Sequence, residues 1–470
     1  MPKEYKKSIG VVITDGVGYR NFILSNFIEQ TKKTFDEVIV FSCLPKSAYD
    51  GLFLDCTIVE LAVFEESFFT WFFRKSKELA HLQLHAKGNF GIQSNLLKNN
   101  SSSKTVRGFA TRFLFFWTKY FNSESWIQGY NTIQQASFSN NEVTNQYRTL
   151  LKDFKVDLLF FTHQRPPYIA PLIYAAEKLK IKTATFIFSW DNLASKGRMA
   201  GNFNYYLVWS DLMKEELNHF YKSINKDQIE VVGTPQFEPY VMGGYEINRE
   251  QYLERFQLKK EIPTLFFSCG DVSTSKNDPL YVELIAKAIL ESKLIKKVNL
   301  LVRTSPAEEP TRFAAIKEKY PFIRWNYPDW NLTRSNHQEA WSQRIPSVQD
   351  VNDLKSILAF CDVNINMLST MSLDAMIFGK PVINTVFGNK ENGLYMDQKF
   401  LKYKHINHVL QSDAVVIVTN ENELITSINQ CLQTPDYKES QQKRLLNLEI
   451  SKPILGTSAR IAEVLKSMCG

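Results

Sequence analysis

The chain of 470 residues is longer than one hydrophobic core usually supports, so we expect two domains. Hydrophobic residues make up 44% and charged residues 22%, which is the composition of an ordinary globular protein. A formal net charge of +7 is mild for this length. It argues against a dedicated nucleic-acid-binding protein and suits anionic small molecules or an anionic membrane surface.

The cysteines and the N-terminus bear on location and on metals. The six cysteines are scattered with neither a CxxC pair nor zinc-site spacing, which indicates reduced thiols in a cytosolic protein. The N-terminus lacks an apolar signal core, and no apolar run is long enough to span a membrane. We expect a cytoplasmic protein, either free or peripheral on the inner face of the cell membrane.

Short apolar runs alternate with helical patterns along the chain, which is typical of parallel α/β domains. In the N-terminal domain, expected over 1–239, we predict strands at 8–14, 37–42, 156–163, 183–189, 204–210 and 229–235. In the second domain, expected over 240–440, we predict strands at 263–271, 297–306, 322–328, 362–368, 380–386 and 414–420. A C-terminal helix over 441–470 is expected to pack back on the first domain. Two doubly wound, Rossmann-like domains facing a central cleft result, with ligands bound at the carboxyl ends of the strands.

The most informative stretch is 353–383, in which a helix leads into a buried strand and a second helix follows. Ser369, Thr370 and Ser372 stand where the strand gives way to the second helix, with Asp374 in its first turn. Hydroxyls and free N–H groups at a helix N-terminus can bind an anion such as a diphosphate. The alternative is simple N-capping of the helix by a hydroxyl side chain.

This block resembles the donor-binding half of GT-B glycosyltransferases. It is especially similar to the CDP-glycerol glycerophosphotransferase group and to related surface-polysaccharide glycosyltransferases. The resemblance implies that Ser369 and Thr370 contact the phosphates of a donor, and that Asp374 meets its ribose or glycosyl part.

Two other stretches match the same group. In LLVRTSP, Arg303 and Pro306 match a motif of this group that reads Arg, any residue, His, Pro, and Ser305 stands in place of the His. An Arg at this position can neutralise a phosphate group, or it can form a salt bridge instead. In SWDNLASK, Trp190 matches the Trp of a Trp-His-Gly motif of the glycerophosphotransferases. Asp191 stands in place of the His of that motif, which is a proposed catalytic base. The neighbouring side chains assigned to the acceptor or phosphate side are Asn192 and Lys196.

Asp191 is one of three candidates for the catalytic base, because a carboxylate of suitable geometry and pKa can accept a proton. Its alternative role is an Asx turn or helix cap. Asp15, in the first strand-exit loop, is the second candidate, and His163, after the strand 156–163, is the third. For both, the alternative is a structural role in a turn or in the core.

Two glycine-containing loops complete the predicted site. The first loop also holds Gly16, which allows a tight turn or the close approach of a ligand, and Arg20, a candidate anion ligand. After the first strand of the second domain, Gly270 and Ser273 are predicted to close over the diphosphate, or else to form an ordinary solvent loop.

The resemblance implies transfer of a sugar from a nucleotide-activated donor to a hydroxyl of a glycan or lipid-linked acceptor, with inversion of configuration. It also implies that no metal and no cofactor is bound, the nucleotide-activated sugar being a co-substrate. A role in bacterial lipopolysaccharide, capsule or other surface-glycoconjugate synthesis is expected. Three alternatives remain open: glycerophosphotransferase-type polymer synthesis, a nucleotide-sugar 2-epimerase on the same fold, and a non-catalytic binding protein.

Residues 61–122 interrupt the α/β alternation and contain nine Lys or Arg against three Glu. Basic residues beside exposed aromatic ones suit the interface of an anionic membrane. The alternative is an ordinary helical subdomain with these aromatic residues in its core. The two clusters concerned are Phe68, Phe69, Trp71, Phe72, Phe73, Arg74 and Lys75, and Arg107, Arg112, Phe113, Phe115, Phe116, Trp117 and Lys119.

Overall fold

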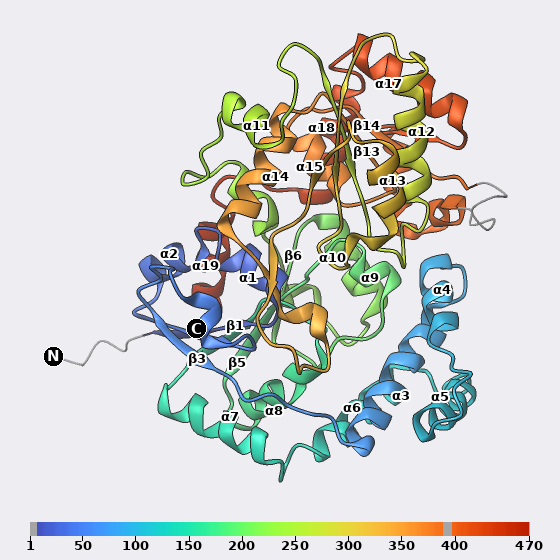
Figure 1. Ribbon diagram of the computed structural model, residues 1–470. Helices are drawn as coiled ribbons and strands as arrows, with labels where there is room; N and C mark the ends of the chain where they lie inside the picture. The colour runs from blue at the N-terminus through green and yellow to red at the C-terminus, as the bar shows by residue number, and fades with distance from the viewer. Residues whose placement is uncertain (1–6, 389–396, 470) are drawn as a thin grey trace. The chain divides into compact units, whose positions relative to one another are not determined.

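The structure is a computed structural model that describes residues 7–388 and 397–469. It divides into two compact units, which are described separately (Figure 1). The first contains Met1–Met242, Leu332–Ile345 and Glu449–Gly470, and the second contains Gly243–Asn331 and Pro346–Leu448.

The first unit is built on a seven-stranded sheet in the order β3-β2-β1-β4-β5-β6-β7, and all its neighbouring strands pair in parallel. The six predicted strands are confirmed, and their burial explains why they read as apolar runs. Sequence analysis missed only β3, a short strand of half-exposed and exposed residues at the sheet edge. The strands are β1 Ser8–Ile13, β2 Glu37–Ser42, β3 Thr57–Glu60, β4 Leu158–Phe161, β5 Lys182–Phe186, β6 Tyr205–Val208 and β7 Ile229–Val231.

Helices of the first unit connect these strands, and the last one, α19, packs on α2. They are α1 Gly16–Phe22, α2 Phe27–Thr34, α3 Phe68–His85, α4 Phe90–Lys98, α5 Val106–Trp117, α6 Glu124–Ala136, α7 Glu142–Asp153, α8 Ala170–Lys178, α9 Asn192–Ser195, α10 Asp211–Phe220 and α19 Thr457–Met468.

The interruption predicted for 61–122 is a group of helices, in which α3 packs against α4, α5 and α6 (Figure 1). Its small core contains Ala80, Ile127 and Tyr130, with the half-buried ring of Trp117 packed against them. Trp71 is buried as well, so part of the aromatic content does serve as a helical core. No helix in the described part of the chain is long and apolar enough to cross a membrane.

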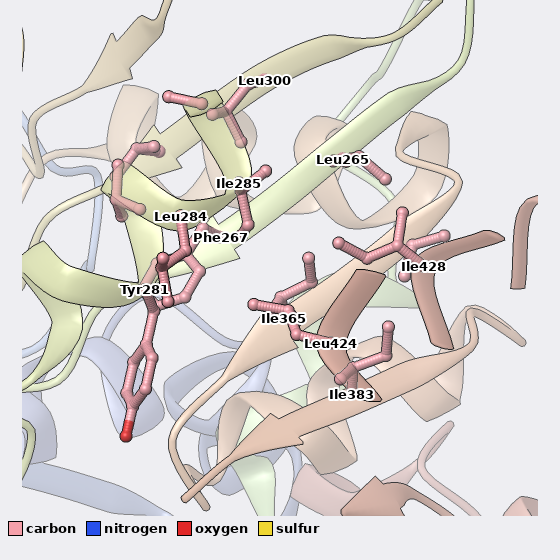
Figure 2. Close-up of a cluster of buried hydrophobic side chains, with 14 of the residues drawn as sticks. Leu265, Phe267, Tyr281, Leu284, Ile285, Leu300, Ile365, Ile383, Leu424 and Ile428 are labelled. Carbon is pink, nitrogen blue, oxygen red and sulfur yellow. The ribbon is translucent and has the colours of Figure 1, made fainter. Parts of the chain in front are cut away.

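The second unit contains a six-stranded sheet in the order β10-β9-β8-β13-β14-β15, again with parallel pairing. The strands agree with the six predicted ones, and their apolar side chains form one core with helices α12 and α17 (Figure 2). The strands are β8 Thr264–Ser268, β9 Asn299–Arg303, β10 Arg324–Asn326, β13 Val363–Asn366, β14 Val382–Thr385 and β15 Val416–Val418. The helices are α11 Arg249–Arg255, α12 Asp278–Leu290, α13 Ala314–Lys319, α14 Val348–Phe360, α15 Met371–Ile377, α16 Lys404–Ser412, α17 Glu421–Gln433 and α18 Glu439–Ile450.

Segment Leu332–Ile345 is grouped with the first unit, although the sequence prediction places it inside the second. It lies between β11 (Trp330–Leu332) and β12 (Arg344–Pro346), which pair as a separate two-stranded sheet. Its side chains bond to distant backbone groups of the first unit, contacts that no local sequence pattern reveals. These are Arg334 to the carbonyl of Cys43 at 3.3 Å and Gln338 to the carbonyl of Phe64 at 2.8 Å.

Gly16 is the position where this segment comes closest to the first loop. A Cβ atom on Gly16 would lie 1.5 Å from the carbonyl oxygen of Arg344. The glycine is therefore required by packing of the chain against itself, in addition to the two roles considered from sequence.

We expect Gly16→Ala to lower the free energy of unfolding by about 1–3 kcal/mol, because the added methyl group must displace backbone. Gly129→Ala is the matched control, since Gly129 lies inside α6 with nothing within 4 Å of its Cβ position. That variant should gain up to about 1 kcal/mol from helix propensity. Urea denaturation followed by circular dichroism measures both, and equal stability of the two variants would contradict the described packing.

Candidate active site

The carboxyl ends of β1 and β4 bring Asp15 and His163 together in the first unit. The two strands are neighbours, with Val12 opposite Phe161, so the residues that follow them emerge side by side. Asp15 is fully buried and is the N-cap of α1, where its Oδ1 accepts the backbone N–H groups of Val17 at 3.0 Å and Gly18 at 2.8 Å. The capping role and the contact with His163 use different oxygens of the same carboxylate.

His163 is held on both sides. Its Nδ1 lies 2.7 Å from Oδ2 of Asp15, and its ring stacks on Phe188 at a centroid distance of 4.0 Å. Within the described residues, Nε2 of His163 is buried and has no hydrogen-bond partner. An ionised Asp15 accepts a hydrogen bond from Nδ1–H, and this fixes the tautomer in which Nε2 carries the lone pair.

The pKa values of this pair agree with an ionised carboxylate and a neutral imidazole. Burial raises the pKa of Asp15, but the electrostatic interaction and hydrogen bond with His163, the Gly18 N–H and the Thr14 hydroxyl outweigh it and hold the value below normal. Burial lowers the pKa of His163, and the opposing effect of Asp15 does not restore it. At neutral pH the buried Nε2 can accept a proton, which is the requirement for a general base.

The loop after β5 places Trp190 and Asp191 at the same sheet edge. Trp190 is buried, and Asp191 is partly exposed, with its Oδ2 at 3.5 Å from Nζ of Lys196 and its Oδ1 accepting Nδ2 of Asn192 at 3.1 Å. Phe188, whose ring stacks on His163 at 4.0 Å, belongs to the same loop as Asp191, and the negative charge of Asp191 acts to raise the pKa of His163. Three of the predicted residues, Asp15, His163 and Asp191, thus gather in one place.

Helix α4 of the inserted group supports this loop directly. Nδ2 of Asn89 donates to the carbonyl of Ala194 at 3.0 Å, and Nδ2 of Asn95 donates to the carbonyl of Ser195 at 2.9 Å. The short helix α9 is thereby held at two successive carbonyls. The position of Asp191 depends on a segment about a hundred residues earlier in the chain.

Two residues near the pair have no role in the sequence prediction. Nε of Arg165 is buried without a hydrogen-bond partner in the described part of the chain. Burial raises the pKa of Glu339 to about 7, opposed by Arg74 and Arg165 and reinforced by Asp15. Arg165 could have been found, because it follows His163 at a strand exit. Glu339 could not have been found from the sequence, because segment Leu332–Ile345, which contains it, joins the first unit only in the tertiary structure.

Arg20 is buried and bonded to protein groups of the same unit. Its Nη1 donates to the carbonyl of Gln236 at 3.2 Å and to Oδ1 of Asn21 at 3.2 Å. The bond to Gln236 ties α1 to the 3-10 helix Pro235–Tyr240. The prediction that Arg20 meets an anion stays a prediction, and the structure gives it a structural role in addition.

In the second unit, a strained turn follows β13. Leu368 has a φ of 48°, in the left-handed region that is costly for a side chain of this size, and Ser369 and Thr370 come next. Below the turn, Asn366, Ser372 and Asn384 form a buried network in which Nδ2 of Asn384 donates to Oδ1 of Asn366 at 3.0 Å and to Oγ of Ser372 at 3.1 Å. The network fixes the turn from beneath.

The hydroxyl residues of this turn have unequal surroundings. Ser372 is buried in the network, whereas Ser369 and Thr370 are half-buried. Oγ of Ser369 accepts the N–H of Met371 at 3.3 Å, and Thr370 is the N-cap of α15 without a side-chain cap bond. Asp374 is buried in the first turn of α15. The hydroxyl of Ser369 therefore accepts one backbone N–H group at the start of α15, as the capping alternative expects. The side chain of Thr370 makes no such cap bond.

Arg303 is engaged in a buried ion pair within the second unit. Its Nη2 donates to both oxygens of Asp350, at 3.0 and 2.8 Å, and its Nη1 donates to Asn326. Asp350 also accepts the indole N–H of Trp330 at 2.9 Å. Of the two roles weighed from sequence, the salt bridge is the one the structure contains, and phosphate binding stays a prediction.

The remaining predicted donor residues lie in the loops after β8 and β9. The N–H of Gly270 donates to Oδ2 of Asp278 at 2.9 Å, and a Cβ on Gly270 would lie 2.3 Å from Oγ of Ser275. Ser273 is exposed and its N–H bonds to Asp271 at 2.8 Å. Ser305 is buried and accepts the N–H of Ala307 at 3.2 Å. In residues 7–388 and 397–469, no group of three or more His, Cys, Asp or Glu is placed to hold a metal ion.

Comparison with known proteins gives the fold. No family model and no curated protein matches the sequence. Among solved structures, a glycosyltransferase from Rickettsia africae ESF-5 matches over 99% of this chain and 98% of its own, at 14% identity and a TM-score of 0.51. The fold is GT-B.

Other similar structures have the same fold under a different enzyme name. The UDP-GlcNAc 2-epimerase from Methanocaldococcus jannaschii matches over 98% of this chain and 100% of its own, at 12% identity and a TM-score of 0.53. The UDP-GlcNAc 2-epimerase from Neisseria meningitidis bound to UDP-GlcNAc covers 98% and 100%, at 13% identity and a TM-score of 0.51. The narrower resemblance to the CDP-glycerol glycerophosphotransferase group is not confirmed by these comparisons.

We expect Arg303→Ala to lower the free energy of unfolding by about 3–5 kcal/mol, because it leaves the buried Asp350 carboxylate without its countercharge. Urea denaturation measures this, and Arg255→Ala is the control, since Arg255 pairs with Asp353 from a half-exposed position. A stable Arg303→Ala variant with weakened nucleotide affinity would instead assign Arg303 to phosphate binding.

The buried His163 predicts a pH dependence of stability. Its pKa is lowered on folding, so the unfolded chain binds more protons, and stability falls as pH drops below about 6.5, the unfolded value. His163→Gln should flatten the slope below that pH by up to about 1.4 kcal/mol per pH unit. His81 and His85, whose pKa values are also lowered, contribute equally to both proteins. Parallel curves of unfolding free energy against pH would show that folding does not lower the pKa of His163.

Proposed function

We propose that the protein is a glycosyltransferase that moves a sugar from a nucleoside-diphosphate donor to a hydroxyl group of an acceptor. The observation that carries the proposal is the buried Asp15–His163 pair, with Nδ1 bonded at 2.7 Å and Nε2 unpartnered in the described residues. Such a pair accepts one proton from a hydroxyl group at neutral pH, which is what glycosyl transfer to an alcohol requires. The GT-B fold is consistent with this chemistry and does not prove it.

In the proposed reaction, Nε2 of His163 takes the proton of the acceptor hydroxyl as its oxygen attacks the anomeric carbon. The bond from that carbon to the donor phosphate breaks, and its electron pair leaves with the nucleoside diphosphate. The carboxylate of Asp15 stabilises the imidazolium ion and holds the ring in one tautomer, as a carboxylate does for His in other proton-transfer sites. A single displacement with one base inverts the configuration of the sugar.

We assign donor binding to the turn after β13 in the second unit. The strained Leu368 turn presents the half-buried Ser369 and Thr370, whose hydroxyl and N–H groups are suited to a diphosphate. Such donors stabilise the charge of the leaving group without a metal ion. Arg165, whose charge acts on His163, is assigned to an anionic group of the acceptor or donor in the first unit.

A second candidate function is 2-epimerisation of a nucleotide sugar, because two of the similar structures are UDP-GlcNAc 2-epimerases. Incubating the protein with nucleotide sugars and no acceptor separates the two proposals. A 2-epimerase converts the sugar while it remains on the nucleotide, or releases the nucleotide with a glycal. A transferase leaves the donor unchanged on that timescale. We place the transferase in synthesis of a bacterial surface glycan, on the cytoplasmic side of the membrane.

We expect His163→Gln and Asp15→Asn each to lower turnover by about 10²–10⁴, with nucleotide binding retained. In Asp15→Asn, the amide oxygen can still cap α1, but the ring would adopt the other tautomer and Nε2 would carry a proton. The nucleotide is first identified by thermal shift with UDP, GDP, CDP, CMP and dTDP. Turnover is then the release of nucleoside diphosphate from the matching nucleotide sugar, with a bacterial membrane lipid extract as the acceptor source.

His408→Gln is the matched control, since His408 is a half-buried histidine in α16 of the second unit. It should keep full turnover. If His163→Gln and Asp15→Asn also keep full turnover, the pair is not the base and Asp191 becomes the first candidate. If no nucleotide raises the melting temperature of the wild type, the assignment of donor binding fails.

A further inference from the structure

Helix α5 presents most of its large apolar side chains to solvent, and Leu114 is the one that is fully buried. Phe109, Phe113 and Phe116 are 60%, 54% and 63% exposed, and Val106 is 73% exposed. The buried positions of the helix are Gly108, Thr111 and Leu114. A surface helix of a globular protein normally has the opposite arrangement, with its apolar stripe facing the core.

The start of α3 continues this surface. Phe68 and Phe69 are 46% and 50% exposed, and the ring of Phe72 stacks on that of Phe113 at a centroid distance of 6.4 Å. Helices α3 and α5 are in contact (Figure 1), so their exposed rings belong to one continuous surface, called here the aromatic face. Its members are Phe68, Phe69, Val106, Phe109, Phe113, Phe116 and Tyr120.

The segment that carries most of this face is basic throughout. Residues 86–122 contain six Lys or Arg and no Asp or Glu. The guanidinium of Arg112 lies over the ring of Phe109 at 4.4 Å, and that of Arg107 lies over Trp71 at 5.3 Å. The six basic residues are Lys87, Lys98, Lys104, Arg107, Arg112 and Lys119.

This charge pattern distinguishes between occupants. A second copy of the chain on the aromatic face would bring two basic segments together, with Arg107 and Arg112 of each copy beside its aromatic rings, which is unfavourable. An anionic lipid surface offers the complementary charge, together with an apolar layer just below the headgroups into which aromatic rings insert.

We propose that the aromatic face binds the protein peripherally to an anionic membrane, with the phenyl rings in the headgroup region and the basic side chains on the lipid phosphates. The same helical group bonds to the Asp191 loop through Asn89, the N-cap of α4, and through Asn95 of α4. Membrane binding would therefore place the Asp15–His163 edge of the sheet close to lipid-linked molecules. The lipid interaction itself does not rest on the proposed transferase activity.

The test is co-sedimentation of the full chain with vesicles, without any sugar nucleotide. The wild type should bind vesicles of phosphatidylglycerol mixed with phosphatidylcholine at low sodium chloride, and should bind less at high salt. It should bind poorly to phosphatidylcholine alone. Charge reversal of Lys104, Arg107 and Lys119 to Glu should lower the partition coefficient by about fivefold per residue. The double variant Phe113→Ser, Phe116→Ser should lower it by about tenfold or more.

Matched controls exclude general effects of charge and apolarity. Phe53→Ser removes a fully exposed ring of the first unit that is not part of the aromatic face, and Lys222→Glu reverses an exposed charge elsewhere. Both should bind like the wild type, and thermal unfolding checks that every variant is folded. A wild type that stays in the supernatant with anionic vesicles overturns the proposal. So does concentration-dependent self-association that Phe113→Ser, Phe116→Ser abolishes, because a second copy would then cover the face.

Discussion

One buried carboxylate organises the first loop of the chain. Asp15 has no solvent around it, so every lone pair that it offers must be met by a protein donor. Two backbone N–H groups of α1 and the hydroxyl of Thr14 meet part of that demand, and His163 meets the rest. The same residue starts the first helix and orients the ring of the proposed base. Helix start and ring orientation are consequently parts of one hydrogen-bond network.

Packing against segment Leu332–Ile345 constrains the same loop from another direction. The carbonyl of Arg344 lies where a side chain of Gly16 would begin, and the ring of His337 meets Tyr168 at 4.9 Å. Tyr168 in turn donates to the carbonyl of Thr14 at 2.8 Å. A change in this segment would alter the position of Asp15 through two contacts, Arg344 with Gly16 and His337 with Tyr168. A distant part of the sequence is therefore connected to the proposed chemistry.

The inserted helices contact the chain after the Asp191 loop on one side and face solvent on the other. On the inner side, Lys77 of α3 donates to the carbonyl of Ala200 at 2.8 Å, and Arg198 donates to Glu124 of α6 at 2.9 Å, so the chain after the Asp191 loop is also anchored to them. Lys77 is buried on this inner side, and burial lowers its pKa to about 7. On the outer side, α5 exposes phenylalanines. The insertion therefore links a surface suited to lipid with the loop that lies beside His163.

The sequence by itself determined the two α/β units, because parallel strands buried on both faces read as uninterrupted apolar runs in a single chain. It also predicted which strand exits carry Asp15, His163, Asp191 and Ser369, since position after a strand is a local property. The sequence did not reveal that Asp15 and His163 form a hydrogen bond, that Arg303 forms an ion pair with Asp350, or that Glu339 belongs to the first unit. It also could not say which aromatic residues of 61–122 are buried, as Trp71 is, and which are exposed, as Phe116 is. Those outcomes depend on contacts between residues far apart in the chain, which only the tertiary structure brings together.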